Sequence, residues 1–222
     1  HTSGLPGLYN KTGFNRNAFT GIDSMPAQRI RRNIRNRTKS FVKDAVRTDI
    51  PEFKPGQKYN YSDVGYVVLG IIIDNITGSY REFMQNQIFT PAGMTSTYIL
   101  DQQTVHPNEA RGYSLKNGKL INIMRFNDYE IPSHYGIFSS VIDLQKWDKA
   151  LNSDLLLNET SKEKAWTAFA LNTGQISGYG LGWFIQNFGG KKIISHGGIT
   201  GTEFIKLVDD SVTVCVLTNL GY

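Results

Sequence analysis

The sequence predicts an α+β fold in which a helical region is followed by an antiparallel sheet. Apolar residues recur with helical spacing in the middle of the chain, and after Gly178 the spacing shortens toward the period of two that is typical of strands. The 222 residues contain no internal repeat and no low-complexity tract. We therefore expect one domain over residues 1–222, mostly helical and loop at 1–177 and antiparallel strands at 178–222.

The first elements are a loop and two helices. Residues 1–28 are rich in Gly, Asn, Thr and Pro, which is typical of loop. A short helix is expected over 40–46, with the serine at its start as N-cap. The next helix is expected to begin at residue 63 and to end at Gly78. Its sequence over 63–73 is apolar nearly all round, so we expect this helix to be buried in the core.

Two later helices are marked by capping boxes, in which a serine side chain caps the backbone three residues further on. The first box is residues 79–82, and Pro91 ends the helix that it starts. The second box is residues 140–143, and the apolar stripe of its helix reaches Leu151.

Four strands in two hairpins complete the expected fold. The first hairpin is 181–186 with 192–195, around the turn Gly189-Gly190, and the second is 203–208 with 212–218, around 209–211.

Composition excludes several classes of protein. With 40% hydrophobic, 12% aromatic and 19% charged residues, the chain is too apolar to be intrinsically disordered. No apolar run approaches the ~18 residues of a membrane-spanning helix, so no membrane span is expected. The single cysteine, Cys215, excludes an intrachain disulfide and a cysteine-rich zinc site. The histidines are far apart and no phosphate-binding loop is present, so we expect neither a metal nor another cofactor.

The net charge of +5 comes from one segment, Arg29 to Lys39, which holds six cations and no acidic residue. It could bind nucleic acid, or it could be a solvated helix whose Ile30 and Ile34 pack on the body. No aromatic residue lies between the arginines as a stacking platform for bases would require. We favour the solvated helix and expect no nucleic-acid partner.

Two short motifs contain residues that can do chemistry. Tyr61-Ser62-Asp63 lies at the start of the expected buried helix, whose dipole favours an anion and could lower the pKa of a phenol. His196-Gly197-Gly198 lies at the end of an expected strand, where glycines let a ligand approach free N–H groups. Taken alone, each motif is better explained without chemistry, the first as a tyrosine that packs a loop onto the core and the second as a turn with an incidental histidine.

Taken together, six blocks in order resemble the serine β-lactamase and penicillin-binding-protein superfamily, in its class C-like branch of β-lactamases, D,D-peptidases and esterases. The blocks, all read from this sequence, are His1-Thr-Ser-Gly-Leu-Pro6, Pro55-Gly56 with Tyr61-Ser-Asp-Val-Gly-Tyr66, Ile88-Phe-Thr-Pro-Ala-Gly-Met94, Gly136-Ile-Phe-Ser-Ser140, Gly178-Tyr-Gly-Leu-Gly-Trp183 and His196-Gly-Gly198.

The resemblance implies a serine acyl-enzyme mechanism on a small-molecule or peptide substrate. By position, Tyr61 takes and returns the proton, and Asp63 falls where the family usually has asparagine. His196 falls where the family has lysine or histidine, facing the tyrosine and the substrate. Gly197, Gly198 and Ile199 are the implied substrate-binding residues, with the Ile199 N–H in the oxyanion hole. The resemblance also favours a periplasmic, cell-envelope or secreted location.

The nucleophile that the resemblance implies is the serine of a Ser-x-x-Lys motif, which the family places before the block at residue 1. The motif occurs here at 40–43 and 161–164, both after that block, and we interpret the first serine as a helix cap and the second as a surface residue. We therefore expect the nucleophile upstream of this chain, and the β-lactamase-like fold to lack N- and C-terminal segments here.

The aspartate at position 63 bears on the substrate. An ionised carboxylate repels a substrate carboxylate by ~1–4 kcal/mol at about 4 Å, which favours esters or amides that lack one. A second hypothesis from a different class is a non-catalytic penicillin-binding-protein-like module that binds a peptide or glycan in the same cleft.

Overall fold

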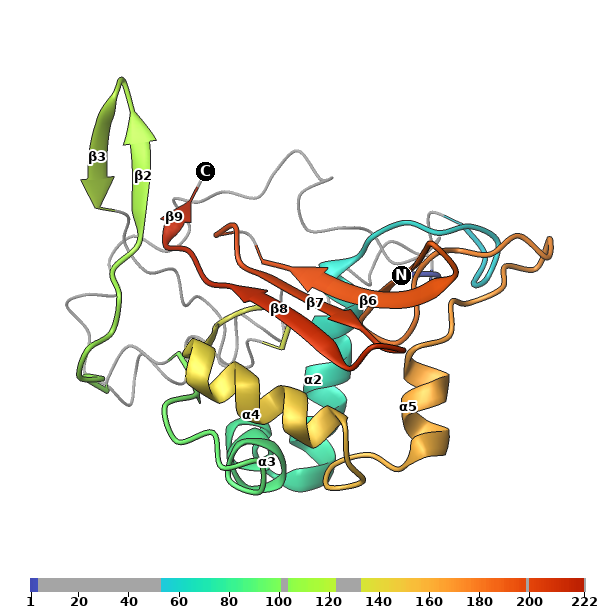
Figure 1. The fold of residues 1–222 in the computed structure, drawn as a ribbon, viewed down its shortest axis with the longest axis horizontal. Coiled ribbons are helices and arrows are strands. Elements are labelled where there is room, and N and C mark those ends of the chain that lie inside the picture. Colours follow the sequence, from blue (N-terminus) through green and yellow to red (C-terminus); the bar gives the residue numbers. More distant parts are fainter. Residues whose placement is uncertain (4–52, 101–103, 123–132, 199, 222) are drawn as a thin grey trace.

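The computed structural model describes residues 1–3, 53–100, 104–122, 133–198 and 200–221 (Figure 1). The helices are α2 (Asp63–Thr77), α3 (Tyr80–Met84), η2 (Gln85–Phe89, a π-helical turn), α4 (Val141–Leu151) and α5 (Glu159–Ala165). The strands are β1 (Tyr98–Ile99), β2 (Tyr113–Lys116), β3 (Lys119–Asn122), β4 (Ile137–Phe138), β5 (Phe184–Phe188), β6 (Lys191–Gly197), β7 (Glu203–Leu207), β8 (Val212–Val216) and β9 (Leu220–Gly221).

The predicted α+β class is confirmed. The largest sheet has the antiparallel order β5-β6-β7-β8, built from the two predicted hairpins, with Gly189 and Gly190 at positive φ in the first turn. Helices α2, α4 and α5 all lie below this sheet in the view of Figure 1. The expected helix at 40–46, the basic segment from Arg29 to Lys39 and the loop over 4–28 lie outside the described residues.

The two predicted serine caps are present. Ser79 accepts a hydrogen bond from the N–H of Glu82 at the start of α3, and Ser140 accepts one from the N–H of Asp143 at the start of α4. Ser62, for which no cap was predicted, accepts one from the N–H of Gly65 at the start of α2. In the 140–143 box the Asp143 carboxylate bonds to Ser96 and Thr97 outside the helix and to Lys146 within it.

The expectation that the helix at 63–73 is buried on all sides is wrong. Val64 and Val67 are buried, but Leu69, Ile72 and Ile76 are exposed, with Ile76 79% accessible to solvent. The buried pair is three residues apart and the exposed residues are three and four apart, so the two sets form two separate faces of α2. Both faces are apolar in sequence, and that pattern cannot tell which of them has a neighbour to pack against.

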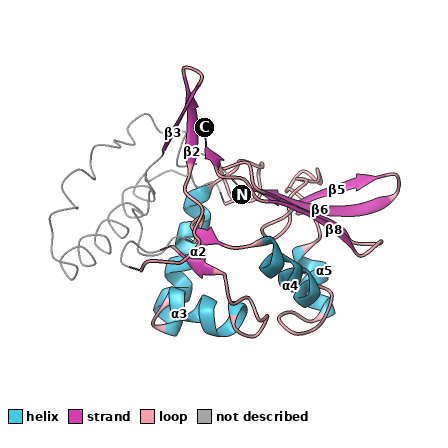
Figure 2. Cartoon of the chain, turned by 60° about the vertical axis from the view of Figure 1, so that its left-hand side comes forward, coloured by secondary structure: helices cyan, strands magenta, loops and turns pink. Residues whose placement is uncertain are grey.

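Two smaller β units within residues 98–138 and one helix were not predicted. Strands β2 and β3 form a hairpin that projects from the body, and β9 adds to it in parallel (Figures 1 and 2). Asn117 and Gly118 both have positive φ in its turn, the geometry for which Asn-Gly is the usual sequence. Strands β1 and β4 form a separate two-stranded pair, and α5 follows its N-cap Asn158.

The apolar core consists of two clusters that share one side chain. The first joins α2, α3 and η2 with β1, around Tyr80, Phe89 and Ile99. The second lies between α4, α5 and the large sheet, around Trp166 and the fully buried Ile194 of β6. Trp147 of α4 packs against both clusters, so α4 connects the helical part to the sheet.

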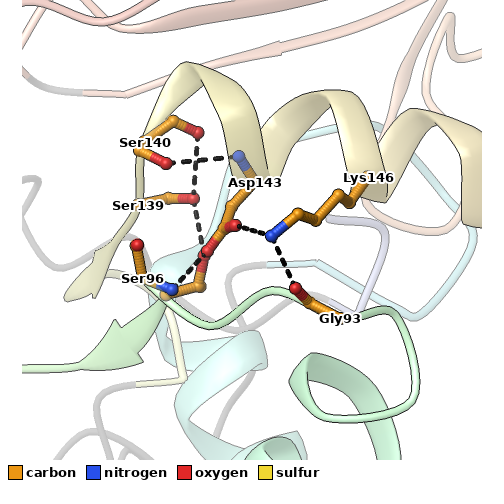
Figure 3. Close-up of polar contacts among 7 residues, drawn as sticks. Gly93, Ser96, Ser139, Ser140, Asp143 and Lys146 are labelled. Carbon is orange, nitrogen blue, oxygen red and sulfur yellow. Dashed lines mark hydrogen bonds and ion pairs between the residues drawn. The ribbon is translucent and has the colours of Figure 1, made fainter.

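A buried carboxylate fixes the start of α4 (Figure 3). The Asp143 side chain is 1% exposed; one of its oxygens accepts hydrogen bonds from the Ser96 N–H at 2.7 Å and the Thr97 hydroxyl at 2.9 Å. The other oxygen accepts from Lys146 Nζ at 2.8 Å, and that ammonium also donates to the Gly93 carbonyl. Together these bonds attach α4 to the turn over residues 93–97.

A buried lysine attaches the same helix to the sheet. Lys206 of β7 is 1% exposed, and its ammonium donates to Asp148 of α4 at 2.8 Å. The Thr213 hydroxyl of β8 donates to the same carboxylate oxygen. A charged residue on the inward face of a strand breaks the apolar alternation, and a carboxylate partner makes its burial tolerable.

Within the described ranges, no helix is both long enough and apolar enough to cross a membrane.

Candidate active site

Tyr61 lies immediately before α2, where the structure places it at the helix N-terminus as predicted. The next residue, Ser62, is buried and caps the helix with its hydroxyl, while its N–H donates to His1 Nδ1 at 2.8 Å. The Tyr61 side chain is 40% exposed. Its phenol ring is therefore held at one end by an ordered backbone and is open to solvent at the other.

The first block of the sequence packs directly against this tyrosine. The His1 and Tyr61 rings have centroids 3.9 Å apart with an interplanar angle of 32°. The backbone is paired as well, because the Gly56 N–H donates to Thr2 O and the Asn60 N–H donates to His1 O. Two blocks that are far apart in sequence thus form one wall of the candidate site.

His196, near the end of β6, lies across from Tyr61. The centroids of the two rings are 6.3 Å apart. His196 Nδ1 is 2.8 Å from the Gly197 carbonyl oxygen, and Nε2 is 3.0 Å from the hydroxyl oxygen of Tyr179. The sequence motifs at 61–63 and 196–198 are therefore brought together, although both ring nitrogens of His196 bond to groups other than Tyr61.

Tyr179 occupies the centre of the site. It is 4% exposed, and its ring contacts His1 at a centroid distance of 4.4 Å and Phe184 at 4.9 Å. Burial raises the pKa of Tyr179, and a hydrogen bond with Tyr66 raises it further. Burial also raises the pKa of Tyr66 itself. Both phenols therefore keep their protons at neutral pH, so neither serves as the base.

Asp63 opens the first turn of α2 on the same side as His196. Burial raises the pKa of its carboxyl group, while its own backbone N–H and the charge of His196 act in the opposite direction. Asp63 therefore adds a carboxyl group to the start of α2, and its charge is influenced by His196.

The Gly197-Gly198 pair forms a turn between β6 and β7. The Gly198 N–H donates to the Thr202 carbonyl, and the Gly201 N–H returns to Gly198 O. A Cβ atom on Gly198 would collide with the Thr202 hydroxyl, so a larger residue here would require Thr202 to change its rotamer. Ile199 lies outside the described residues. The roles of these three residues in substrate binding stay predictions, as do the catalytic roles of Tyr61, Asp63 and His196.

Sequence reasoning did not identify His1, Tyr66 and Tyr179 as members of the site. All three lie within the six sequence blocks, but the order of these blocks along the chain does not show which side chains are in contact. The glycines that flank Tyr179 were a usable signal. A Cβ on Gly180 would lie 2.3 Å from the Ala165 carbonyl oxygen, so this segment is forced close to the end of α5, and Tyr179 beside it is buried.

The Ser-x-x-Lys motif at 161–164 supplies none of the side chains of this site. Ser161 is half-buried in α5 and its N–H donates to the cap Asn158, while Lys164 is exposed. The segment 40–43 lies outside the described residues. Among the residues that the structure describes, no group of three or more His, Cys, Asp or Glu side chains could hold a metal ion.

Comparison with known proteins extends these findings. Residues 1–222 match the sequence model of a family described as Beta-lactamase. Penicillin-binding protein 4* of Bacillus subtilis (strain 168) is 32% identical over 188 residues, covering 75% of this chain and 41% of that protein. An octameric penicillin-binding protein homologue from Pyrococcus abyssi is 27% identical with a TM-score of 0.64, covering 83% of this chain and 48% of that one.

A third relative supports the fold. The structure of a D-stereospecific amidohydrolase from Streptomyces sp. superposes with a TM-score of 0.74 over 99% of this chain and 66% of that one, at 20% identity. This chain therefore spans about two fifths of the curated relative and half to two thirds of these solved structures.

Proposed function

This chain belongs to the β-lactamase family, and from that premise we propose that the protein carrying it is a serine hydrolase that cleaves an ester, amide or peptide bond through an acyl-enzyme. The family match covers all 222 residues, and the six sequence blocks occur in order. Because the chain spans only part of its relatives, the proposal concerns the full-length protein.

The observation that carries the proposal is the meeting of Tyr61 and His196. The two residues come from opposite halves of the sequence and from different secondary structures, yet their rings lie 6.3 Å apart around the buried Tyr179. A half-exposed phenol at a helix N-terminus, next to an imidazole, is suited to exchange a proton with a bound group.

In the proposed reaction the nucleophile is the serine of a Ser-x-x-Lys motif upstream of His1. Its hydroxyl oxygen attacks the substrate carbonyl carbon while its proton passes to the oxygen of an ionised Tyr61. Collapse of the tetrahedral intermediate breaks the bond to the leaving group, which takes the proton from Tyr61. Water then attacks the acyl-enzyme, gives its proton to Tyr61, and the serine oxygen leaves and recovers that proton.

The negative charge of Asp63 favours one class of substrate. In its ionised form it only accepts hydrogen bonds, and it repels a carboxylate by ~1–4 kcal/mol at about 4 Å. Esters or amides without a free carboxylate next to the scissile bond are therefore the preferred substrates.

The test is covalent labelling of the full-length protein. A fluorophosphonate probe should add to one serine, and peptide mapping should locate that serine in a Ser-x-x-Lys motif before His1. Fluorescent penicillin in a parallel reaction asks whether a β-lactam carboxylate is accepted. Binding of a peptide or glycan with no adduct from either probe would reject the hydrolase and support a non-catalytic binding module.

A further inference from the structure

Both ring nitrogens of His196 take part in hydrogen bonds, and together they define its tautomer. The Gly197 carbonyl oxygen, 2.8 Å from Nδ1, can only accept, so Nδ1 carries the proton and donates it. In the neutral ring Nε2 is then an acceptor. The Tyr179 hydroxyl, 3.0 Å away, must therefore donate to Nε2.

Tyr179 is held in place by a group of aromatic rings. Its ring centroid is 4.4 Å from that of His1 and 4.9 Å from that of Phe184, and the residue is 4% exposed. This packing holds the Tyr179 hydroxyl against Nε2 of His196.

We propose that Tyr179 is a positioning residue that, together with the Gly197 carbonyl, fixes the ring orientation and the Nδ1–H tautomer of His196. Its significance for catalysis rests on the proposed function, because the orientation of His196 matters to turnover only if Tyr61 exchanges protons with a substrate. The geometry itself does not depend on that function.

This arrangement defines how His196 can act on the cleft. The donor of the neutral ring bonds to Gly197 and the acceptor bonds to Tyr179, so a substrate meets the ring without a hydrogen bond from either nitrogen. The Tyr61 ring is near enough to feel a charge on the imidazole, at a centroid distance of 6.3 Å. His196 therefore influences Tyr61 through its position and its charge.

A tyrosine that only filled space at position 179 could be replaced by phenylalanine without consequence for His196. The hydroxyl has a specific role because burial raises the pKa of Tyr179, and its proton is retained as a permanent donor. Without this hydroxyl, Nε2 loses its partner, and only the exposed contact with the Gly197 carbonyl favours the Nδ1–H form. In water, free imidazole readily exchanges between its two neutral forms, so the ring orientation and the tautomer of His196 would both be less well defined.

The experiment is long-range ¹H–¹⁵N NMR of the full-length protein with ¹⁵N-labelled histidine, at a pH where imidazoles are neutral. The His196 signals are identified by their loss in His196→Gln. Wild type should show a protonated Nδ1 and an unprotonated Nε2 for His196. Tyr179→Phe should add a population with the proton on Nε2.

Tyr59→Phe is the matched control, because the Tyr59 ring also contacts Tyr179, at 5.9 Å, while both nitrogens of His196 bond elsewhere. In turnover assays Tyr179→Phe should lower kcat about tenfold with little change in KM, the effect of one lost hydrogen bond in a positioning role.

The outcomes separate the two proposals. An unchanged His196 tautomer in Tyr179→Phe, or an equal change in Tyr59→Phe, overturns the positioning role even if a serine adduct forms. Absence of any adduct with the predicted tautomer change rejects the hydrolase and leaves the positioning role supported. If Tyr179→Phe does not fold, the wild-type spectrum carries the test, and a His196 ring that is protonated on Nε2 or that exchanges between the two neutral forms overturns the proposal.

Discussion

Replacing Asp143 by asparagine should destabilise the protein far more than the same change at a surface carboxylate. Asp143 accepts three hydrogen bonds, from the Ser96 N–H, the Thr97 hydroxyl and the Lys146 ammonium. Asparagine has only one acceptor oxygen. Its NH₂ group would face one of these three donors and could not accept a hydrogen bond from it. At least one of the three partners would therefore lose its acceptor.

The magnitude follows from these contacts. A buried donor left without an acceptor costs about 1–3 kcal/mol. A hydrogen bond whose acceptor changes from a carboxylate to a neutral amide loses about 1 kcal/mol. The Lys146 side chain is one third exposed, so its ion pair adds little, at about 0–1 kcal/mol. We expect a loss of about 3 kcal/mol in the free energy of unfolding, which lowers Tm by about 6–12 °C for a chain of this length.

The assay is thermal unfolding followed by circular dichroism, at pH 7 and again near pH 3. Burial alone would raise the pKa of Asp143, but the hydrogen bonds from Lys146, Thr97 and Ser96 hold it below its ordinary value. The native state therefore binds fewer protons than the unfolded state just below the ordinary pKa, near ~3.9. The stabilisation is present above that pH and is lost as pH falls through the lowered pKa, so the two proteins should converge in acid.

The matched control is Asp210→Asn, which removes a carboxylate that also pairs with a lysine. The Lys191 side chain that it contacts is half exposed, and the cost should stay below about 1 kcal/mol. Equal Tm values for the two variants, or a difference that persists unchanged at low pH, would refute the assignment of Asp143 as a buried anchor.

Three further predictions concern the candidate site in the full-length protein. Tyr61→Phe should lower turnover by ~10²–10⁴ without unfolding the protein, and unchanged steady-state kinetics would assign Tyr61 to packing. His196→Lys should flatten the pH–rate profile between pH 5 and 8, because imidazoles exchange their proton in this range and lysine stays charged; identical profiles would place the titrating group elsewhere. Burial raises the pKa of Asp63, so the native state binds more protons than the unfolded state above the ordinary pKa, and this carboxyl lowers stability as pH rises from about 4. Asp63→Asn should remove that decline and unfold at a higher temperature at pH 7, and a lower Tm would show that the carboxylate is a net stabiliser.

Local features of the fold were predictable because their cause is local. The caps Ser79 and Ser140 lie within three residues of the N–H groups they bind, so their sequence spacing is sufficient. The exposure of Leu69 and Ile76 was not predictable, because it depends on which face of α2 meets another element. The β2–β3 hairpin had a local signal in Asn117-Gly118, and it was missed because the hairpin is short and lies among loops.

The site shows the same division between local and long-range causes. Tyr61 and His196 were predicted from short motifs, and the structure brings them together. The hydrogen bond between Tyr179 and His196 joins two segments of the chain, and the order of the six sequence blocks does not show that these segments are in contact. The inward position of Lys206 could not be predicted either, because its carboxylate partner Asp148 lies on a helix far away in sequence.

The geometry of the site depends on a helix that supplies none of the site side chains described above. Tyr61 is held by α2, which packs in the helical cluster, and His196 is held by β6, which packs in the sheet cluster. These two clusters meet at Trp147 of α4, and the same helix is attached to the 93–97 turn by Asp143 and to β7 through Lys206. Any shift of α4 would therefore move α2 and β6 relative to each other. The distance between Tyr61 and His196 is therefore set by that packing as well as by the side chains around them.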